Sequence, residues 1–154
     1  LKSLYLRVFH KEKRKGPLTM DKRTFRTNLF KLIFQVEFCE SDAVEDKLTS
    51  YYEAQEIIKE KDQLALSSAV YALIEKLPEI DARIETHANG WKKERLGKAE
   101  LAILRVALYE MFYDEVPDAV AINEAVELAK TYAPEQAPKF INGILGKIER
   151  EKEA

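Results

Sequence analysis

The sequence predicts an all-α protein, a compact bundle of about seven helices. Three observations support this fold class. The 154 residues include only five Gly and five Pro, so few positions break a helix or favour a turn. Apolar residues recur at the three- and four-residue intervals that form one face of a helix. No segment alternates apolar and polar residues over the length of a strand.

Composition excludes several classes of function. The protein has one cysteine, Cys39, and two histidines, His10 and His87, far apart in the chain. These residues are too few for a Cys–His nucleophile pair or a clustered metal site. We therefore expect no enzyme activity, no catalytic residue, no metal and no cofactor. The longest uncharged run, residues 63–74, is too short to span a membrane. A reducing cytoplasmic environment fits the single thiol.

Charge is distributed unevenly along the chain. Residues 1–26 hold nine Lys/Arg and two Asp/Glu, whereas the remaining residues hold 16 Lys/Arg and 25 Asp/Glu. We therefore predict a basic N-terminal extension, residues 1–19, followed by one helical domain, residues 20–154. A basic segment on an acidic body either contacts an acidic partner such as nucleic acid or is simply solvated.

The first predicted helix begins near Arg23 and carries two apolar stripes. One stripe contains Phe25, Leu29, Leu32, Ile33 and Val36, and the other contains Phe30, Phe34 and Phe38. Two apolar stripes on one helix are typical of a helix with neighbours on more than one side.

The later helices follow from the same periodicity. They are predicted at residues 43–60, 62–76, 78–89, 99–113 and 118–132, with a last helix that begins near Pro138. Pro78 suits the first turn of its helix, Asn89–Gly90 suits a turn, and Pro117 ends the helix before it. Gly143 and Gly146, three residues apart in the last helix, predict the close approach of a neighbouring helix. Gly90 and Gly97 have the wrong spacing for a phosphate-binding P-loop.

Three cations cluster at the start of the first helix. Lys22, Arg23 and Arg26 lie where the helix dipole disfavours positive charge by about 0.3–1 kcal/mol each. The same position suits a bound phosphate, which accepts hydrogen bonds from guanidinium groups and free backbone N–H groups. Lys22, Arg26 and Phe30 fall on one stripe, so Phe30 either stacks on an unpaired base or belongs to the core with the cations solvated.

Four blocks of the sequence resemble one known family. They are "KRTFRTNLFKLIFQVEF", "AILRVALYEM", "VPDAVAINEAVELAKTYA" and "KFINGILGKI". Their order and spacing resemble the NusB family of bacterial transcription antitermination factors, over roughly residues 22–148. The resemblance implies a non-enzymatic helical protein that pairs with NusE, a small-subunit ribosomal protein. The pair is expected to bind boxA-type single-stranded RNA in rRNA operon transcripts and to join the RNA polymerase antitermination complex.

The resemblance also assigns roles to residues. Those implied in RNA binding are Lys22, Arg23, Arg26, Gln136, Lys139 and Phe140, and those implied in contact with NusE are Phe34 and Glu100. Phe34 serves the core equally well. Phe25 stands where the family usually has alanine, and Pro134 and Pro138 flank Gln136. We expect the loss of Arg23 and Arg26 to weaken RNA binding while the melting temperature holds or rises slightly.

Two alternatives remain open from the sequence. One is a stand-alone rRNA-targeting module, related to the N-terminal domain of rRNA methyltransferases. The other is a self-associating helical module. The sequence does not decide between monomer and homodimer, and it leaves the role of residues 1–19 open.

Overall fold

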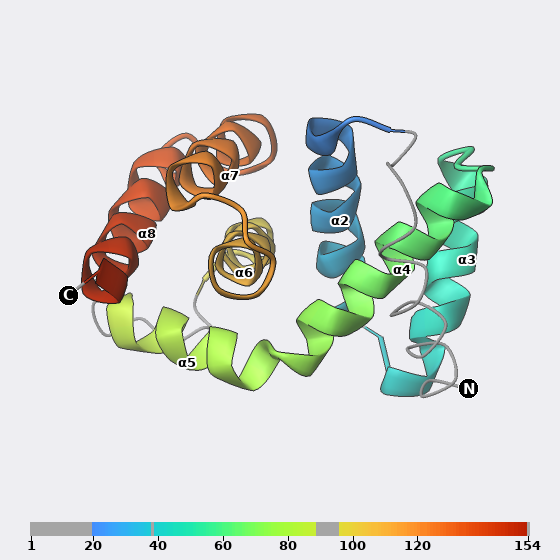
Figure 1. The fold of residues 1–154 in the computed structure, drawn as a ribbon, viewed down its shortest axis with the longest axis horizontal. Coiled ribbons are helices and arrows are strands. Elements are labelled where there is room, and N and C mark those ends of the chain that lie inside the picture. The colour runs from blue at the N-terminus through green and yellow to red at the C-terminus, as the bar shows by residue number, and fades with distance from the viewer. Residues whose placement is uncertain (1–19, 38, 89–95, 154) are drawn as a thin grey trace. The chain divides into compact units, whose positions relative to one another are not determined.

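The computed structural model describes residues 20–37, 39–88 and 96–153. Within these residues the protein forms seven α-helices and one short 3-10 helix, η1, and no strand (Figure 1), which confirms the predicted all-α fold. The elements are α2 (Lys22–Val36), η1 (Ser41–Ala43), α3 (Val44–Ala54), α4 (Glu60–Glu75), α5 (Leu77–His87), α6 (Lys98–Tyr113), α7 (Asp118–Tyr132) and α8 (Ala137–Glu153). The extension 1–19, Phe38 and the Asn89–Gly90 turn lie outside the described residues.

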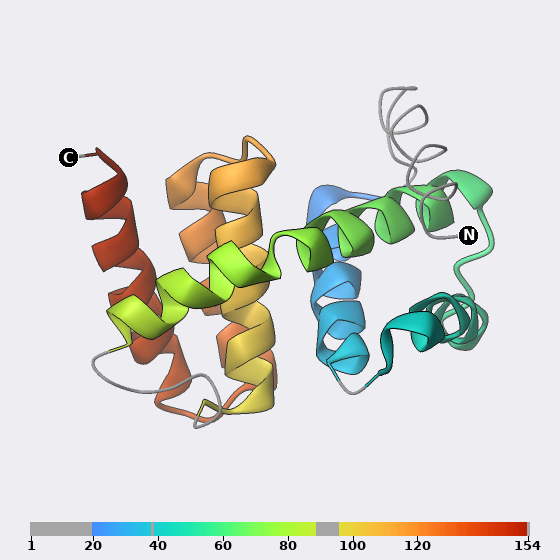
Figure 2. The same cartoon turned by 90° about the horizontal axis from the view of Figure 1, so that it is seen from below.

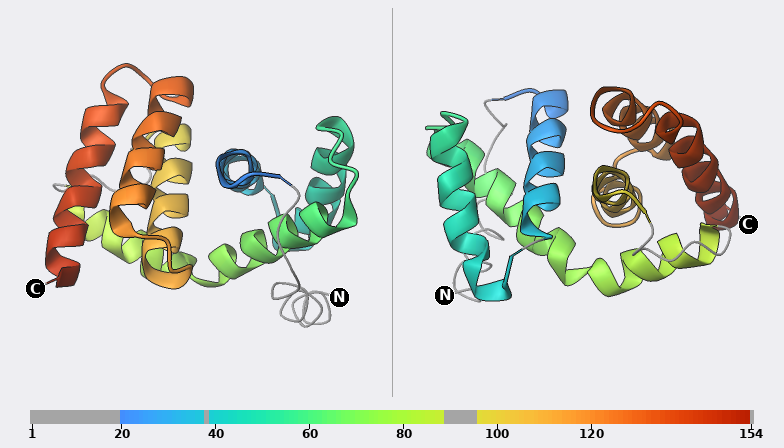
Figure 3. Two further views of the ribbon diagram at one scale, coloured as in Figure 1. Left: turned by 45° about the horizontal axis from the view of Figure 1, so that its top comes forward. Right: turned by 180° about the vertical axis from the view of Figure 1, so that it is seen from behind.

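The chain forms two compact units that divide between Ile74 and Glu75. In the first unit, α2 packs against α3, and α4 runs across them (Figure 3). Tyr51 on α3 donates a hydrogen bond of 2.6 Å to Asn28 on α2. The neighbouring Tyr52 donates to the backbone carbonyl of Gln63 on α4 at 3.0 Å. Two adjacent tyrosines therefore join α3 to both other helices of this unit.

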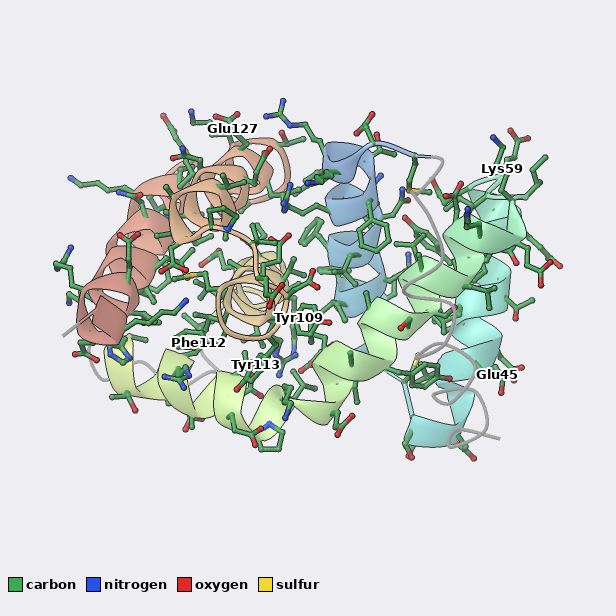
Figure 4. The ribbon with its side chains drawn as sticks, in the orientation of Figure 1. Glu45, Lys59, Tyr109, Phe112, Tyr113 and Glu127 are labelled. Atoms are coloured by element: carbon green, nitrogen blue, oxygen red, sulfur yellow. The ribbon has the colours of Figure 1, made fainter. Side chains whose placement is uncertain are left out.

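The second unit is built around α6. Every residue from Leu101 to Met111 is buried, and α6 contacts α5, α7 and α8. Figure 2 shows α6, α7 and α8 side by side, with α5 crossing them. Phe112 and Tyr113 at the end of α6 lie beside α5 (Figure 4). Short connections, residues 114–117 and 133–136, join α6 to α7 and α7 to α8, so these sequence neighbours are also packing neighbours.

The end of α3 differs from the prediction. The helix ends at Ala54, well before residue 60, because Glu56 takes the left-handed conformation with φ 55°. The Ile57 N–H then donates to the Tyr52 carbonyl at 2.9 Å, which closes a Schellman cap. Glycine usually occupies this position. Because Glu56 gives no such signal, the apolar periodicity alone predicted a helix that was too long.

Pro78 has the role that the sequence predicts, whereas Pro117 does not. Pro78 lies in the first turn of α5, as predicted. Pro117 does not itself end α6, because that helix ends at Tyr113 and Glu115 then turns the chain with φ 54°. Pro117 is instead the N-cap residue of α7.

Candidate nucleic-acid interface

Asp21, which the sequence reasoning did not single out, caps the start of α2. Its carboxylate accepts the backbone N–H of Thr24 at 2.8 Å. This hydrogen bond, with a second contribution from the Thr24 side chain, holds the pKa of Asp21 below its usual value. An Asp just before the first apolar residues is a recognisable N-cap pattern. The helix that begins with three cations is therefore stabilised by a carboxylate directly before them.

The three predicted cations of α2 do not share one environment. Lys22 and Arg23 are exposed, whereas Arg26 is buried with only 7% of its surface exposed. The first turn of α2 contains no acidic residue. Lys22 and Arg23 therefore place two solvent-exposed cations at the positive end of the helix, next to the Asp21 carboxylate, which interacts electrostatically with Arg23. Arg26 has a packing role that the sequence did not predict.

The aromatic residues of α2 favour the core. Phe30 is 3% exposed, so it belongs to the core and the interpretation of Phe30 as a base-stacking residue is wrong. Phe34 is half-buried, and its ring centroid lies 6.4 Å from that of Phe30. Phe34 therefore both packs on the core and keeps part of its ring accessible.

The Asn28 side chain holds α2 against α3. Its amide nitrogen donates to the Thr24 carbonyl at 3.0 Å, while its amide oxygen accepts the Tyr51 hydroxyl. Asn28 and Tyr51 are 23 residues apart in the sequence, so no local sequence pattern indicates this hydrogen bond. The hydrogen bond ties α2 to α3 at a position two residues after Arg26.

The second group of predicted RNA-binding residues lies at the start of α8. Gln136 is exposed just before the helix, Lys139 is exposed on its first turn and Phe140 is half-buried. The Gln136 carbonyl accepts the backbone N–H of Phe140 at 3.4 Å. The fold thus gathers these three residues within one turn of the second unit. Lys22, Arg23 and Arg26 belong to the first unit, and each group is described within its own unit.

Glu100 lies in the first turn of α6 and is half-buried. Its carboxylate folds back over Gly97, the N-cap residue, so that Oε1 lies 2.7 Å from where a Gly97 Cβ would be. A carboxylate at this end of a helix is stabilised by the helix dipole. The position predicted for partner contact therefore also has a local role in α6.

The two glycines of α8 do not have the predicted role. No heavy atom of the described residues lies within 4 Å of a Cβ built on Gly143. At Gly146 that Cβ would meet the Arg150 guanidinium of the same helix at 3.4 Å. Neither glycine therefore serves the close approach of a neighbouring helix, and that prediction is wrong.

The described residues also bear on other classes of site. They contain no group of three or more His, Cys, Asp or Glu arranged to hold a metal ion. His87 contacts the Glu151 carboxylate through Nε2, and its Nδ1 lies 2.8 Å from the Arg83 carbonyl, so both ring nitrogens have structural partners. No helix in the described part of the chain is long and apolar enough to cross a membrane.

Comparison with known proteins gives consistent similarities. A family model described as the NusB family matches residues 23–150. The chain is 42% identical over 130 residues to the transcription antitermination protein NusB of Lachnoclostridium phytofermentans, covering 84% of this chain and 98% of that protein. It is also 42% identical to the protein of the same name from Acetivibrio thermocellus, covering 86% of this chain and 91% of that protein.

Solved structures share the fold. T. maritima NusB aligns with a TM-score of 0.77 and 32% identity, covering 87% of this chain and 94% of that one. A crystal structure of the antitermination factors NusB and NusE in complex with dsRNA aligns with a TM-score of 0.74 and 24% identity, covering 84% and 96%. The helical fold and these similarities define a protein of the transcription antitermination class. The chain belongs to the NusB family.

Proposed function

We propose that the protein pairs with NusE and that the pair binds boxA-type single-stranded RNA in rRNA operon transcripts. Membership of the NusB family carries this proposal, because relatives 42% identical over nearly their whole length are transcription antitermination proteins. A NusB of the same fold has been crystallised with NusE and dsRNA. The pair would act in the bacterial cytoplasm with the RNA polymerase antitermination complex, without catalysis of its own.

The start of α2 supports a phosphate contact. Lys22 and Arg23 are exposed at the start of the helix, where the Asp21 carboxylate already accepts the Thr24 N–H. A guanidinium binds a phosphate through two parallel hydrogen bonds, and the helix dipole favours the anion. Arg26 contributes by holding the start of α2 in place rather than by a fully exposed charge.

The start of α8 supports contacts of a different kind. Phe140 offers part of an aromatic ring on which an unpaired base can stack, and the exposed Lys139 beside it suits a phosphate. Gln136 carries both a donor and an acceptor, so it is suited to a base edge. These three residues would supply base recognition, while Lys22 and Arg23 would supply affinity.

NusE is proposed to contact Phe34 and Glu100. Phe34 provides a partly accessible aromatic ring, and Glu100 provides a carboxylate suited to a basic partner. Aromatic residues and charge complementarity are common determinants of specific protein interfaces.

RNA binding with and without purified NusE tests the function. We expect a boxA-containing oligonucleotide to bind more tightly than a scrambled one, with a larger preference when NusE is present. Equal affinity for both oligonucleotides, with and without NusE, would contradict the proposed function. A duplex form of the boxA oligonucleotide separates recognition of a single strand from recognition of a helix.

A double variant tests the site. Lys22→Ala/Arg23→Ala should weaken boxA binding and reduce the slope of log affinity against log salt by about 1.4, or about 0.7 for each lost phosphate contact. Lys59→Ala/Lys61→Ala is a matched control, because it removes two exposed cations around the start of another helix in the same unit. An equal effect of both double variants would indicate nonspecific attraction only.

A further inference from the structure

Gly143 leaves an exposed gap in the side chains of α8. The residue is exposed, and no heavy atom of the described residues lies within 4 Å of the position that its Cβ would take. Glycine within a helix is unfavourable relative to alanine because the unfolded chain loses more freedom on folding. Packing against the described residues therefore does not account for a glycine here, although the helix would be more stable with alanine.

The surroundings of Gly143 are basic. Lys139 lies four residues before it and Lys147 four residues after it, so all three lie on one face of the helix. Both lysines are exposed, and the adjacent Asn142 is exposed as well. With a rise of 1.5 Å per residue, the two lysines are separated by about 12 Å along the helix axis. Residues 137–148 contain no Asp or Glu, although acidic residues outnumber basic ones in the whole chain.

We propose that the RNA strand held at Lys139 and Phe140 continues along α8, with its sugar–phosphate backbone lying against Gly143 and reaching Lys147. The absence of a side chain lets a ligand backbone approach the helix closely. Lys139 and Lys147 would neutralise phosphates on either side of that contact, and the Asn142 amide would donate to a phosphate or 2′-hydroxyl oxygen. This inference rests on the proposed RNA-binding function and extends its site along the helix.

The cations favour RNA over a protein partner. Two exposed lysines and an exposed asparagine, within a stretch of sequence that contains no Asp or Glu, match a polyanion. A protein backbone would also fit against a bare glycine, but it would bring no charge to match the lysines.

Gly143→Ala tests the proposal with two effects of opposite sign. The melting temperature should rise by about 2–4 °C, because alanine favours the helix and meets open space. The affinity for a boxA oligonucleotide should fall about fivefold, equivalent to about 1 kcal/mol, because the methyl group occupies the surface that the strand approaches. A rise in stability together with unchanged RNA affinity would overturn the inference.

Gly146→Ala is the matched control. Its methyl group would lie 3.4 Å from the Arg150 guanidinium, at a position that is already half-buried. We expect a similar gain in melting temperature with no change in RNA affinity. An equal loss of affinity in both variants would indicate a general effect on α8 and would contradict a specific contact at Gly143.

Lys147→Ala provides a second measurement. It should weaken binding and reduce the salt slope by about 0.7.

If the unaltered protein prefers boxA and Lys139→Ala weakens binding while Gly143→Ala and Lys147→Ala do not, the extension along α8 is wrong and the proposed function stands. If Gly143→Ala impairs NusE pairing or self-association instead of RNA binding, the face binds protein. If the unaltered protein shows no boxA preference, both proposals fail.

Discussion

Arg105 and Asp81 form a buried, two-pronged ion pair between α6 and α5. The Arg105 Nε donates to Asp81 Oδ1 and its Nη2 donates to Oδ2, both at 2.9 Å. Arg105 is 4% exposed and Asp81 is 8% exposed. The geometry satisfies both carboxylate oxygens in a place that excludes water. The pair thus fixes the register of α5 on the central helix of the second unit.

Removal of either partner should destabilise the protein strongly. Asp81→Leu and Arg105→Met each leave one buried charge without its main partner, at a cost of about 3–5 kcal/mol. The double variant Asp81→Leu/Arg105→Met should recover part of this loss, because no buried charge remains. Urea unfolding followed by circular dichroism measures all three free energies. Additive losses in the double variant would show that the two residues act independently.

Arg83 and Phe112 form a second contact between α5 and α6. The guanidinium carbon of Arg83 lies 3.9 Å from the centroid of the Phe112 ring, and the Lys152 ammonium lies 4.8 Å from the same centroid. The Arg83 Nε is buried with no hydrogen-bond partner among the described residues, and the Phe112 ring lies against the same guanidinium group. Phe112→Leu keeps the apolar bulk and should cost about 1–2 kcal/mol through two lost cation–π contacts. No loss in thermal unfolding would contradict this role for the ring.

Helix identity was predictable because it depends on apolar periodicity over many residues. The range predicted for α7, residues 118–132, matches the structure. The end of α3 was not predictable, because Glu56 adopts a left-handed conformation that is usually found at glycine. Which side of α8 carries Gly143, and how deeply Arg26 is buried, depend on contacts between residues distant in sequence. For the same reason the sequence could propose site residues but could not separate exposed cations from a buried one.

Substitutions of Arg23 and Arg26 should differ in their effects on RNA binding and on stability. The burial of Arg26 changes the expectation that both can be removed without loss of stability. Arg26→Ala removes a packed side chain and should cost about 1–3 kcal/mol, whereas Arg23→Ala on the surface should stay within about 0.5 kcal/mol of the unaltered protein. Arg23→Ala should weaken RNA binding and reduce its salt slope. Chemical denaturation and RNA titration of both single variants measure this, and equal stability of the two would contradict the packing role of Arg26.

Asp21 should make the start of α2 sensitive to acid. Its pKa in the folded protein lies below the usual value of about 3.9, so its contribution to stability is present above that pH. The contribution is lost as the pH falls through the lower, folded-state value. Asp21→Ala should therefore melt at a lower temperature than the unaltered protein at pH 7, and the difference should vanish in acid. Asp21→Asn keeps a capping oxygen and should lose the pH dependence. A difference in melting temperature that is the same at every pH would contradict the capping role of the carboxylate.

Gly97 and Glu100 allow the partner contact to be tested without a change of charge. Gly97 has φ −62° and ψ 148°, which alanine also adopts, but the new methyl group would lie 2.7 Å from Glu100 Oε1. The flexible carboxylate must then move away from the start of α6. If NusE recognises the carboxylate in its observed place, Gly97→Ala should weaken NusE pairing in the same direction as Glu100→Lys, with the fold retained. Co-purification with NusE and a melting curve measure both properties.

Glu79→Lys, a charge reversal in the first turn of α5, should leave pairing unchanged. Normal pairing by Glu100→Lys would remove Glu100 from the interface, whereas normal pairing by Gly97→Ala alone would show that the charge matters and its position over Gly97 does not.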